Sequence, residues 1–282
     1  MKPSISILGL GTMGRPMAGK LIEAGYDVRG WNRSTLPANL TAGIQLCHNL
    51  EEAARADVCL LMLLDSAAVN AVLDQLTPHL PAGRTILDMG SSDPAHSRKI
   101  ARRLSAEGIG WVDAPVSGGP EGASKGTLAI MAGGTEKDFS RVKPILDVLG
   151  GNVVHVGGPG LGHTVKVINQ LIVGLTIETV AEALTLAEKS GVDPRMVQQA
   201  LKGGFADSKI LQLHGTRMID RSYVPGAKAT IQLKDLKLAT ALAAEVRANL
   251  PHLASTLERY EKLVVDGDGE LDHSVIHKLL WS

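Results

Sequence analysis

The sequence has little cysteine and no excess of charge of either sign. Its two cysteines, Cys47 and Cys59, are too few for a disulfide framework, and Cys59 lies in an apolar run typical of a buried core. A reduced, cytoplasmic compartment fits this usage best. Lys plus Arg and Asp plus Glu both total 29, so the formal net charge is zero. This balance gives no electrostatic argument for binding nucleic acid or an anionic membrane surface, and any anion site must be local.

The sequence also lacks long apolar runs. No run approaches the roughly 20 residues of a membrane-spanning helix, and the N-terminal stretch MKPSISILGLG is too short for a signal peptide. We therefore expect a soluble protein without a membrane partner. Its 282 residues, 44% of them hydrophobic, are enough for two domains with proper cores.

The first part of the chain alternates short apolar runs with helical patterns, as in residues 16–24 and 94–107. Several of the runs are continuously apolar, which is typical of parallel strands covered on both faces. This βαβ rhythm predicts an α/β domain with a doubly wound, mostly parallel sheet. The predicted strands cover residues 5–10, 27–31, 57–63, 85–89, 110–114, 127–133 and 152–156.

The character of the sequence changes after Gly162. Strand patterns vanish, residues 163–191 predict one long helix, and the remainder is helical too, ending in a helix near 274–280. We place an α/β domain at 1–162 and an all-α substrate and oligomerisation domain at 163–282, joined by the long helix. That helix exceeds the usual globular length, which favours a homodimer or homotetramer.

The motif GLGTMG, residues 9–14, follows the first predicted strand and precedes a helix. Glycines at this spacing permit a tight turn and a close approach of the backbone to a pyrophosphate, so they predict a Rossmann dinucleotide site. About twenty residues further on stand Asn32, Arg33 and Ser34 rather than a carboxylate. Arg33 and Ser34 could bind a 2′-phosphate, which favours NADP(H), with NAD(H) possible. The alternative reading of these three residues is a solvated polar turn.

The segment DAPVSGGPEGASKGT begins at the end of a predicted strand, where ligands gather in open α/β sheets. Ser117 offers a hydroxyl, and Gly118 and Gly119 let backbone amides converge on an anion, which suits the carboxylate of a small substrate. An ordinary glycine loop would give the same pattern.

Lys166 follows the turn GPGLG on an otherwise apolar helix. Positions three and four apart share a helix face, so Lys166, Asn169 and Gln170 form one polar patch. A lysine held in a desolvated cleft can exchange a proton near neutral pH, and two amides could orient a substrate oxygen beside it. The alternative is a lysine that snorkels from a domain-edge helix.

These segments together resemble the β-hydroxyacid dehydrogenase family, which includes 3-hydroxyisobutyrate dehydrogenase and the tartronate, succinic semialdehyde and glyoxylate reductases. The resemblance runs through ILGLGTMGRPMA, DAPVSGGPEGASKGTLAIMAGG, GPGLGHTVKVINQ, LKDLKLA and DHS, and so covers nearly the whole chain. It is strongest to tartronate semialdehyde reductase, through KVINQLIVGLTIETVAEALTLAEKSGV and the KGG that follows.

The resemblance implies an enzyme that reduces a small carboxylate-bearing aldehyde with NADPH, with Lys166 as the proton donor. It implies substrate binding by Ser117, Gly118, Gly119, Asn169 and Gln170. The implied cofactor-binding residues are Gly9, Leu10, Gly11, Thr12, Met13, Gly14, Asn32, Arg33, Ser34, Leu63, Leu64, Ser91 and Lys234. Asp235 stands beside the last of these.

The chain departs from the family at three places. Leu63-Leu64 replaces a common Leu-Pro, Asn32 stands where NAD-preferring members carry Asp, and Ala227 follows Pro225-Gly226 where relatives commonly have an aromatic residue. The last change could reshape the substrate pocket.

Other functions stay open at this point. They are a 3-hydroxyisobutyrate-type dehydrogenase working in the oxidative direction, an imine reductase, and a non-catalytic NADP-binding protein. Imine reductases usually lack a lysine at the position of Lys166, which counts against that reading.

Four histidines give no functional prediction from the sequence. His273 and His277 are four apart on a predicted C-terminal helix, but the sequence offers no third ligand, so we expect no metal site. His155 and His163 flank the glycine turn, and no carboxylate is evident to orient either of them.

Overall fold

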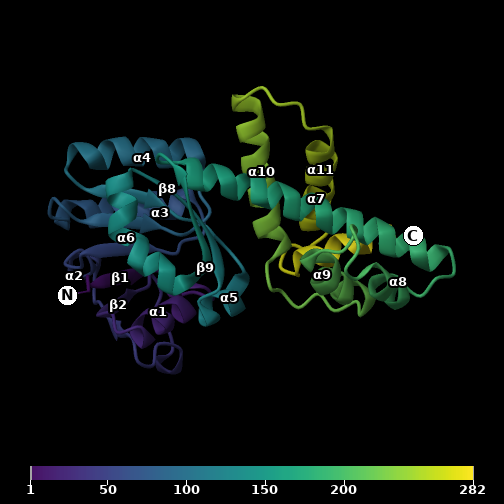
Figure 1. The fold of residues 1–282 in the computed structure, drawn as a ribbon, viewed down its shortest axis with the longest axis horizontal. Coiled ribbons are helices and arrows are strands. Elements are labelled where there is room, and N and C mark those ends of the chain that lie inside the picture. The colour runs from purple at the N-terminus through teal and green to yellow at the C-terminus, as the bar shows by residue number, and fades with distance from the viewer. Residues whose placement is uncertain (1, 282) are drawn as a thin grey trace. The chain divides into compact units, whose positions relative to one another are not determined.

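The computed structural model describes residues 2–281 and divides into two compact units, residues 1–166 and 167–282 (Figure 1). The first unit is a sheet covered by helices and the second is helical, so the predicted fold class is confirmed. One long helix, α7 (Leu161–Lys189), runs through the division between the units.

The first unit contains a nine-stranded sheet in the order β3-β2-β1-β4-β5-β6-β8-β7, with β9 paired to β8. Strands β1 to β6 are parallel, because each returns through a helix. The strands are β1 (Ile5–Leu8), β2 (Val28–Trp31), β3 (Gln45–Leu46), β4 (Val58–Leu61), β5 (Thr85–Asp88), β6 (Gly110–Asp113), β7 (Val116–Ser117), β8 (Leu128–Gly134) and β9 (Gly150–Gly157).

Alternate side chains of each strand enter two separate cores, one on each face of the sheet. Ile5 and Ile7 pack with helices α1, α5 and α6, while Leu8 and Cys59 pack with α2, α3 and α4. Because both faces of the central strands are covered, these strands are mostly apolar, and this pattern made them visible in the sequence. The helices are α1 (Gly14–Glu23), α2 (Leu50–Ala53), α3 (Ser66–Leu76), α4 (Pro94–Ala106), α5 (Gly119–Lys125) and α6 (Glu136–Leu149).

Two short strands, β3 and β7, were not predicted. Each has only two residues, and the two residues of β3 are exposed, so neither leaves a hydrophobic pattern. Strand β8 runs antiparallel to β6 and β7, a direction that the sequence did not indicate.

The second unit packs the C-terminal part of α7 with helices α8 (Pro194–Leu201), α9 (Lys209–Ile219), α10 (Ala229–Glu245) and α11 (Pro251–Val265). Ile177, Ala181 and Leu184 of α7 are buried in its core, together with Leu236 and Tyr260.

Helix α7 corrects one expectation. By length and composition alone it is apolar enough to cross a membrane, with a mean hydropathy of 1.4 over its most apolar 18-residue window. The expectation that no apolar run approaches membrane-spanning length is therefore wrong. Buried core helices meet the same criterion, and 39% of this window is buried.

The final predicted helix is a 3-10 helix, η3 (His273–Leu280), rather than an α-helix. Side chains three apart eclipse one another in a 3-10 helix, so His273 and His277 do not share a face as predicted. His277 contacts the Tyr223 hydroxyl through Nδ1 at 3.4 Å, whereas His273 lies against Gln232 and His214.

Candidate active site

The carboxyl ends of four parallel strands meet at one edge of the sheet. The register pairs Leu8 with Leu61, Leu61 with Asp88, and Asp88 with Asp113, which are the last residues of β1, β4, β5 and β6. The loops that follow these strands therefore emerge side by side. The chain reverses direction across the sheet between β1 and β4, and this switch point is where open α/β sheets bind their ligands.

The three glycines of the loop after β1 differ in their surroundings. A Cβ at Gly9, whose φ is +107°, would overlap the Met62 carbonyl oxygen, and a Cβ at Gly14 would overlap the Gly9 carbonyl oxygen. A Cβ at Gly11 would meet no atom of the described chain within 4 Å. Gly9 and Gly14 are thus required by the protein's own packing, whereas Gly11 faces open space.

This loop fits a dinucleotide. Helix α1 begins at Gly14, and in the described chain neither a capping side chain nor an acidic residue occupies its first turn. The positive end of the helix therefore faces the open space beside Gly11, as a pyrophosphate requires. Thr12 and Met13 form the turn between Gly11 and the helix.

The neighbouring loops contact one another at the same edge. Gly9 packs against Met62, and a Cβ at Gly90 would come within 2.6 Å of the Leu63 carbonyl oxygen. The structure thus brings Leu63 and the segment before Ser91 next to the glycine loop. Leu64 is exposed beside them.

The end of β2 is held by Asn32. Its Oδ1 accepts a hydrogen bond from the Leu10 N–H at 3.1 Å, and its Nδ2 donates to the Ser34 carbonyl at 2.8 Å. Asn32 thereby joins the glycine loop to the turn, while Arg33 and Ser34 are exposed at its tip.

The predicted anion turn follows β6. Ser117 ends β7, and Gly118 and Gly119 follow with φ of +136° and +65°, which are backbone conformations that favour glycine. Gly119 begins α5, and a Cβ there would meet no described atom within 4 Å.

The first turn of α7 lies directly on the ends of β6 and β8. A Cβ at Gly162 would overlap the carbonyl oxygens of Asp113 and Met131, and one at Gly133 would come within 2.6 Å of the Gly162 nitrogen. Only glycine allows this approach. Lys166 follows one turn later and is 8% exposed, so the lysine does not extend into bulk solvent.

A buried cluster that the sequence analysis missed lies under this turn. His163 is fully buried, with Nε2 at 3.7 Å from Asp88 Oδ2 and Nδ1 at 3.8 Å from Asp113 Oδ2. The expectation that no carboxylate accompanies His163 is therefore wrong. His155 also has one, since its Nδ1 lies 3.2 Å from Glu136. Asp88 and Asp113 lie at the ends of neighbouring predicted strands, and this placement was the signal in the sequence that could have revealed the cluster.

Asp113 is hydrogen-bonded on both oxygens. Oδ1 accepts from the Gly160 N–H at 2.7 Å and Oδ2 from the His163 N–H at 2.9 Å. Burial raises the pKa of Asp113 to about 7, and the Asp88 charge adds to the rise, while the two backbone hydrogen bonds oppose it.

The second unit holds the other predicted site residues. The Asn169 amide donates to Gln170 Oε1 at 2.8 Å, and Gln170 Nε2 donates to Asp235 Oδ2 at 2.5 Å. Lys234 forms an ion pair with Asp235 at 3.0 Å. Gln170 and Asp235 thus connect the polar face of α7 to the LKDL segment of α10.

The DHS segment, Asp272 to Ser274, is a hydrogen-bonding centre of the second unit. Asp272 accepts from Ser274 Oγ at 2.6 Å and from the Gly226 N–H at 2.9 Å, and it pairs with Arg217 at 2.5 Å and with His214 Nδ1 at 3.4 Å. His214, Asp272 and His273 are close enough to hold a cation, so His214 is the neighbour that the sequence did not offer. Since donors already surround the Asp272 carboxylate, we interpret the group as structural.

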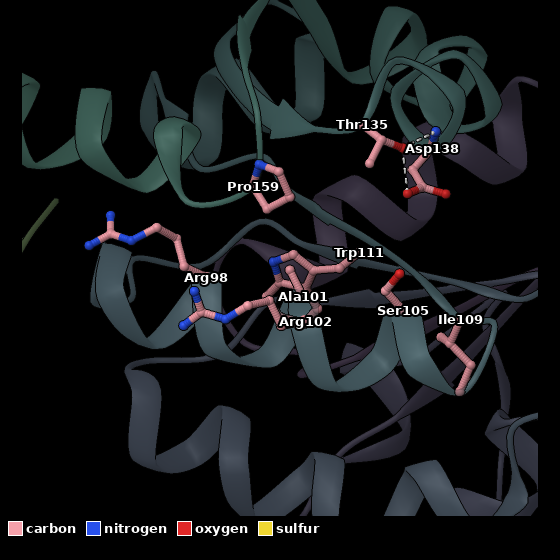
Figure 2. A pocket seen from close by; sticks show the side chains of 9 residues that line it. All are labelled: Arg98, Ala101, Arg102, Ser105, Ile109, Trp111, Thr135, Asp138 and Pro159. Carbon is pink, nitrogen blue, oxygen red and sulfur yellow. Dashed lines mark hydrogen bonds between the residues drawn. The ribbon is translucent and has the colours of Figure 1, made fainter.

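A groove of about 390 Å³ lies elsewhere on the first unit (Figure 2). Arg98, Arg102 and Ser105 of α4 line one side, and Thr135 and Asp138 at the start of α6 line the other. None of the predicted site residues, all of which are described, lines this groove. The carboxyl edge remains the candidate site, because the open glycine, the anion turn and the buried lysine all lie in the segments that end there.

A doubly wound sheet with a G-x-G-x-x-G loop at its switch point is typical of dinucleotide-binding proteins. Comparison with known proteins agrees. Residues 4–157 match the NAD-binding domain of 6-phosphogluconate dehydrogenase, and residues 160–280 match the NAD-binding domain model of NADP-dependent 3-hydroxyisobutyrate dehydrogenase.

Individual relatives match over nearly their whole length. The chain is 41% identical to 2-hydroxy-3-oxopropionate reductase of Escherichia coli, over 98% of this chain and 96% of the relative. Among solved structures, 3-hydroxyisobutyrate dehydrogenase of Salmonella typhimurium has a TM-score of 0.89 at 30% identity, covering 98% and 99% of the two chains. The Mycobacterium tuberculosis 3-hydroxyisobutyrate dehydrogenase with L-serine has a TM-score of 0.90 at 28% identity, with both chains fully covered. The chain belongs to the β-hydroxyacid dehydrogenase family of NAD(P)-dependent enzymes.

Proposed function

We propose that this enzyme uses NADPH to reduce a small aldehyde that carries a carboxylate, of the tartronate semialdehyde, succinic semialdehyde or glyoxylate type, to the hydroxy acid. The observation that carries the proposal is the buried Lys166, on the helix that starts at the carboxyl edge of the sheet. The 41% identity to an enzyme named 2-hydroxy-3-oxopropionate reductase supports this substrate class. That name denotes the reduction of tartronate semialdehyde.

Preference for NADPH is supported by the end of β2. The side chain there is Asn32, whose amide is used to join the glycine loop to the turn, so no carboxylate repels a 2′-phosphate. Arg33 and Ser34 are exposed at the same turn and can supply a guanidinium and a hydroxyl to that phosphate.

In the proposed reaction, each group of site residues has its own role. Gly9 to Gly14 hold the pyrophosphate, and the bound cofactor supplies the hydride. Ser117 and the amides of Gly118 and Gly119 bind the substrate carboxylate. Lys166 donates a proton from Nζ to the carbonyl oxygen, and its burial excludes the water that would compete for that proton. Asn169 and Gln170 orient the same oxygen from the following turn of α7.

The test of this assignment is Lys166→Ala. We expect turnover of tartronate semialdehyde with NADPH to fall by at least about 100-fold, the range for loss of a general acid. NADPH should still bind with a dissociation constant close to that of the unaltered enzyme. A variant that keeps most of its kcat would refute the role of Lys166.

A second candidate is a 3-hydroxyisobutyrate-type dehydrogenase that works in the oxidative direction. The match of residues 160–280 to the 3-hydroxyisobutyrate dehydrogenase model favours it. A panel of tartronate semialdehyde, succinic semialdehyde, glyoxylate, 3-hydroxyisobutyrate and L-serine, assayed with both cofactors, separates the two candidates. The presence of Lys166 disfavours an imine reductase.

We also infer that the enzyme self-associates and acts in the cytoplasm. Ile168, Ile172 and Leu186 of α7 are exposed apolar side chains, and such a surface is typical of a subunit interface. Cys47 and Cys59 are both free buried thiols, which suits a reducing compartment. Sedimentation analysis tests the first inference, and localisation of the tagged protein tests the second.

A further inference from the structure

The cluster of Asp88, His163 and Asp113 has no part in the chemistry proposed above. All three side chains are fully buried, so none of them can touch a substrate. Burying two carboxylates and an imidazole in one space costs free energy. A protein that keeps such a cluster is expected to use its arrangement.

Each member of the cluster holds a different part of the candidate site. Asp113 accepts the N–H groups of Gly160 and His163, so a residue of β6 caps the first turn of α7. Asp88 Oδ1 accepts from the Gly90 N–H at 3.0 Å, and Oδ2 accepts from Ser92 Oγ at 3.3 Å, which holds the loop on either side of Ser91.

His163 connects these two anchors. Its ring lies between the carboxylates at 3.7 and 3.8 Å, and it stands three residues before Lys166 on α7. A Cβ at Gly162 would overlap carbonyl oxygens of β6 and β8, so this turn of α7 packs directly against the sheet.

We propose that Asp88, His163 and Asp113 are positioning residues that fix Lys166 relative to the Ser91 loop, so that the lysine meets the reacting carbonyl in the correct geometry. The inference rests on the proposed role of Lys166. Misplacement of a catalytic group by about 1 Å can lower the rate by roughly 100-fold, so a change in the buried cluster should affect kcat without any contact to substrate.

The experiment compares variants at His163 with a destabilising control in the core of the same unit. His163→Leu fills the space but leaves both carboxylates without their imidazole, while His163→Gln and His163→Asn each restore one polar group. Val142→Ala is the control, because Val142 of α6 is fully buried in the core of the same unit and lies outside the site. Three quantities are measured: kcat and KM with tartronate semialdehyde, the dissociation constant of NADPH, and hydrogen exchange of the amides in 158–166.

We expect His163→Leu to lower kcat by roughly 10- to 100-fold, with KM and the NADPH dissociation constant within about threefold of the unaltered enzyme. Amides of 158–166 should lose protection in this variant but not in Val142→Ala, which should keep its kcat at a temperature where both are folded. Recovery of part of the kcat by His163→Gln or His163→Asn separates positioning from loss of stability. If His163→Leu does not fold, the same measurements on His163→Gln and His163→Asn test the proposal.

The inference is overturned if the folded His163 variants keep kcat and amide protection within twofold of Val142→Ala. Lys166→Ala, assayed in parallel, distinguishes the two failures. If that variant retains turnover, the proposed function is wrong. If it is inactive while the His163 variants are fully active, only the positioning role is wrong.

Discussion

The glycine loop after β1 yields the sharpest prediction, because its glycines have different reasons to be glycine. Gly11→Ala adds a Cβ where the described chain has no atom within 4 Å, and Gly11 does not have a positive φ. We expect the protein without cofactor to keep its stability or to gain about 0.4–1 kcal/mol, since alanine restricts the unfolded chain. The same methyl group would occupy the space that we propose for the pyrophosphate. The NADPH dissociation constant should rise at least tenfold, which is about 1.4 kcal/mol.

Gly14→Ala should have the opposite effect on stability and destabilise the protein without cofactor. Its Cβ would overlap the Gly9 carbonyl oxygen and lie 3.0 Å from the carbonyl carbon, and backbone atoms cannot rotate away as a side chain can. Alanine gains about 1 kcal/mol of helix propensity at this position. Overpacking against the backbone costs about 1–3 kcal/mol or more, so the net effect is destabilising.

Gly19→Ala is the matched control. Gly19 lies in the same helix, α1, and a Cβ there meets no described atom within 4 Å, so this variant should gain stability and leave NADPH binding unchanged. Urea unfolding without cofactor and fluorescence titration with NADPH measure the two effects separately. Unchanged NADPH affinity in Gly11→Ala would mean that this loop does not carry the cofactor.

Three further predictions concern charge. Arg33→Ala should weaken NADPH at least tenfold and NADH by less than twofold, whereas Asn32→Asp should favour NADH; equal effects on both cofactors in titrations would refute the 2′-phosphate role. Because burial raises the pKa of Asp113 to about 7, its neutral form stabilises the fold at low pH and that stability is lost as pH rises from about 4 through 7, by up to ~1.4 kcal/mol per unit. In Asp113→Asn, the urea midpoint should depend less on pH between about 4 and 7. An unchanged pH dependence would contradict the raised pKa of Asp113. Burial opposes ionisation of Asp272, yet the hydrogen bond from His214, the His273 charge and other donors hold its pKa below its usual range, so its contribution is lost only as pH falls below about 4. Asp272→Ala should lower the free energy of unfolding at pH 7 by on the order of 3 kcal/mol, measured by urea unfolding; a loss below 1 kcal/mol would show that the centre is dispensable.

The sheet was predictable because burial on both faces leaves a plain mark on the sequence. Strand β4 is fully buried along its length and appears as an unbroken apolar run, and β5 is equally buried with Ile86 and Leu87 at its centre. Strand β3 has two exposed residues and owes its existence to pairing with β2, which no local pattern encodes.

The site was predictable only where its chemistry lies in a contiguous segment. The glycine loop and the Lys166 turn are each short motifs. The cluster around His163 joins residues 50 and 75 positions apart, so it emerges only when the register sets Asp88 beside Asp113. The η3 segment could not be distinguished from an α-helix, because its apolar residues Val275, Ile276, Leu279 and Leu280 lie on one face at α-helical spacing.

The distribution of buried charge supports the location of the site independently of any motif. A protein with no net charge has no long-range field to collect an anion, so recognition depends on groups held at one place. In the described part of the first unit, the buried ionisable side chains apart from tyrosine and cysteine are Asp88, Asp113, His163 and Lys166. All four belong to the ends of β5 and β6 or to the first two turns of α7. Burying ionisable side chains costs free energy, and in the described part of this unit they are buried only beside the loops where cofactor and substrate are expected.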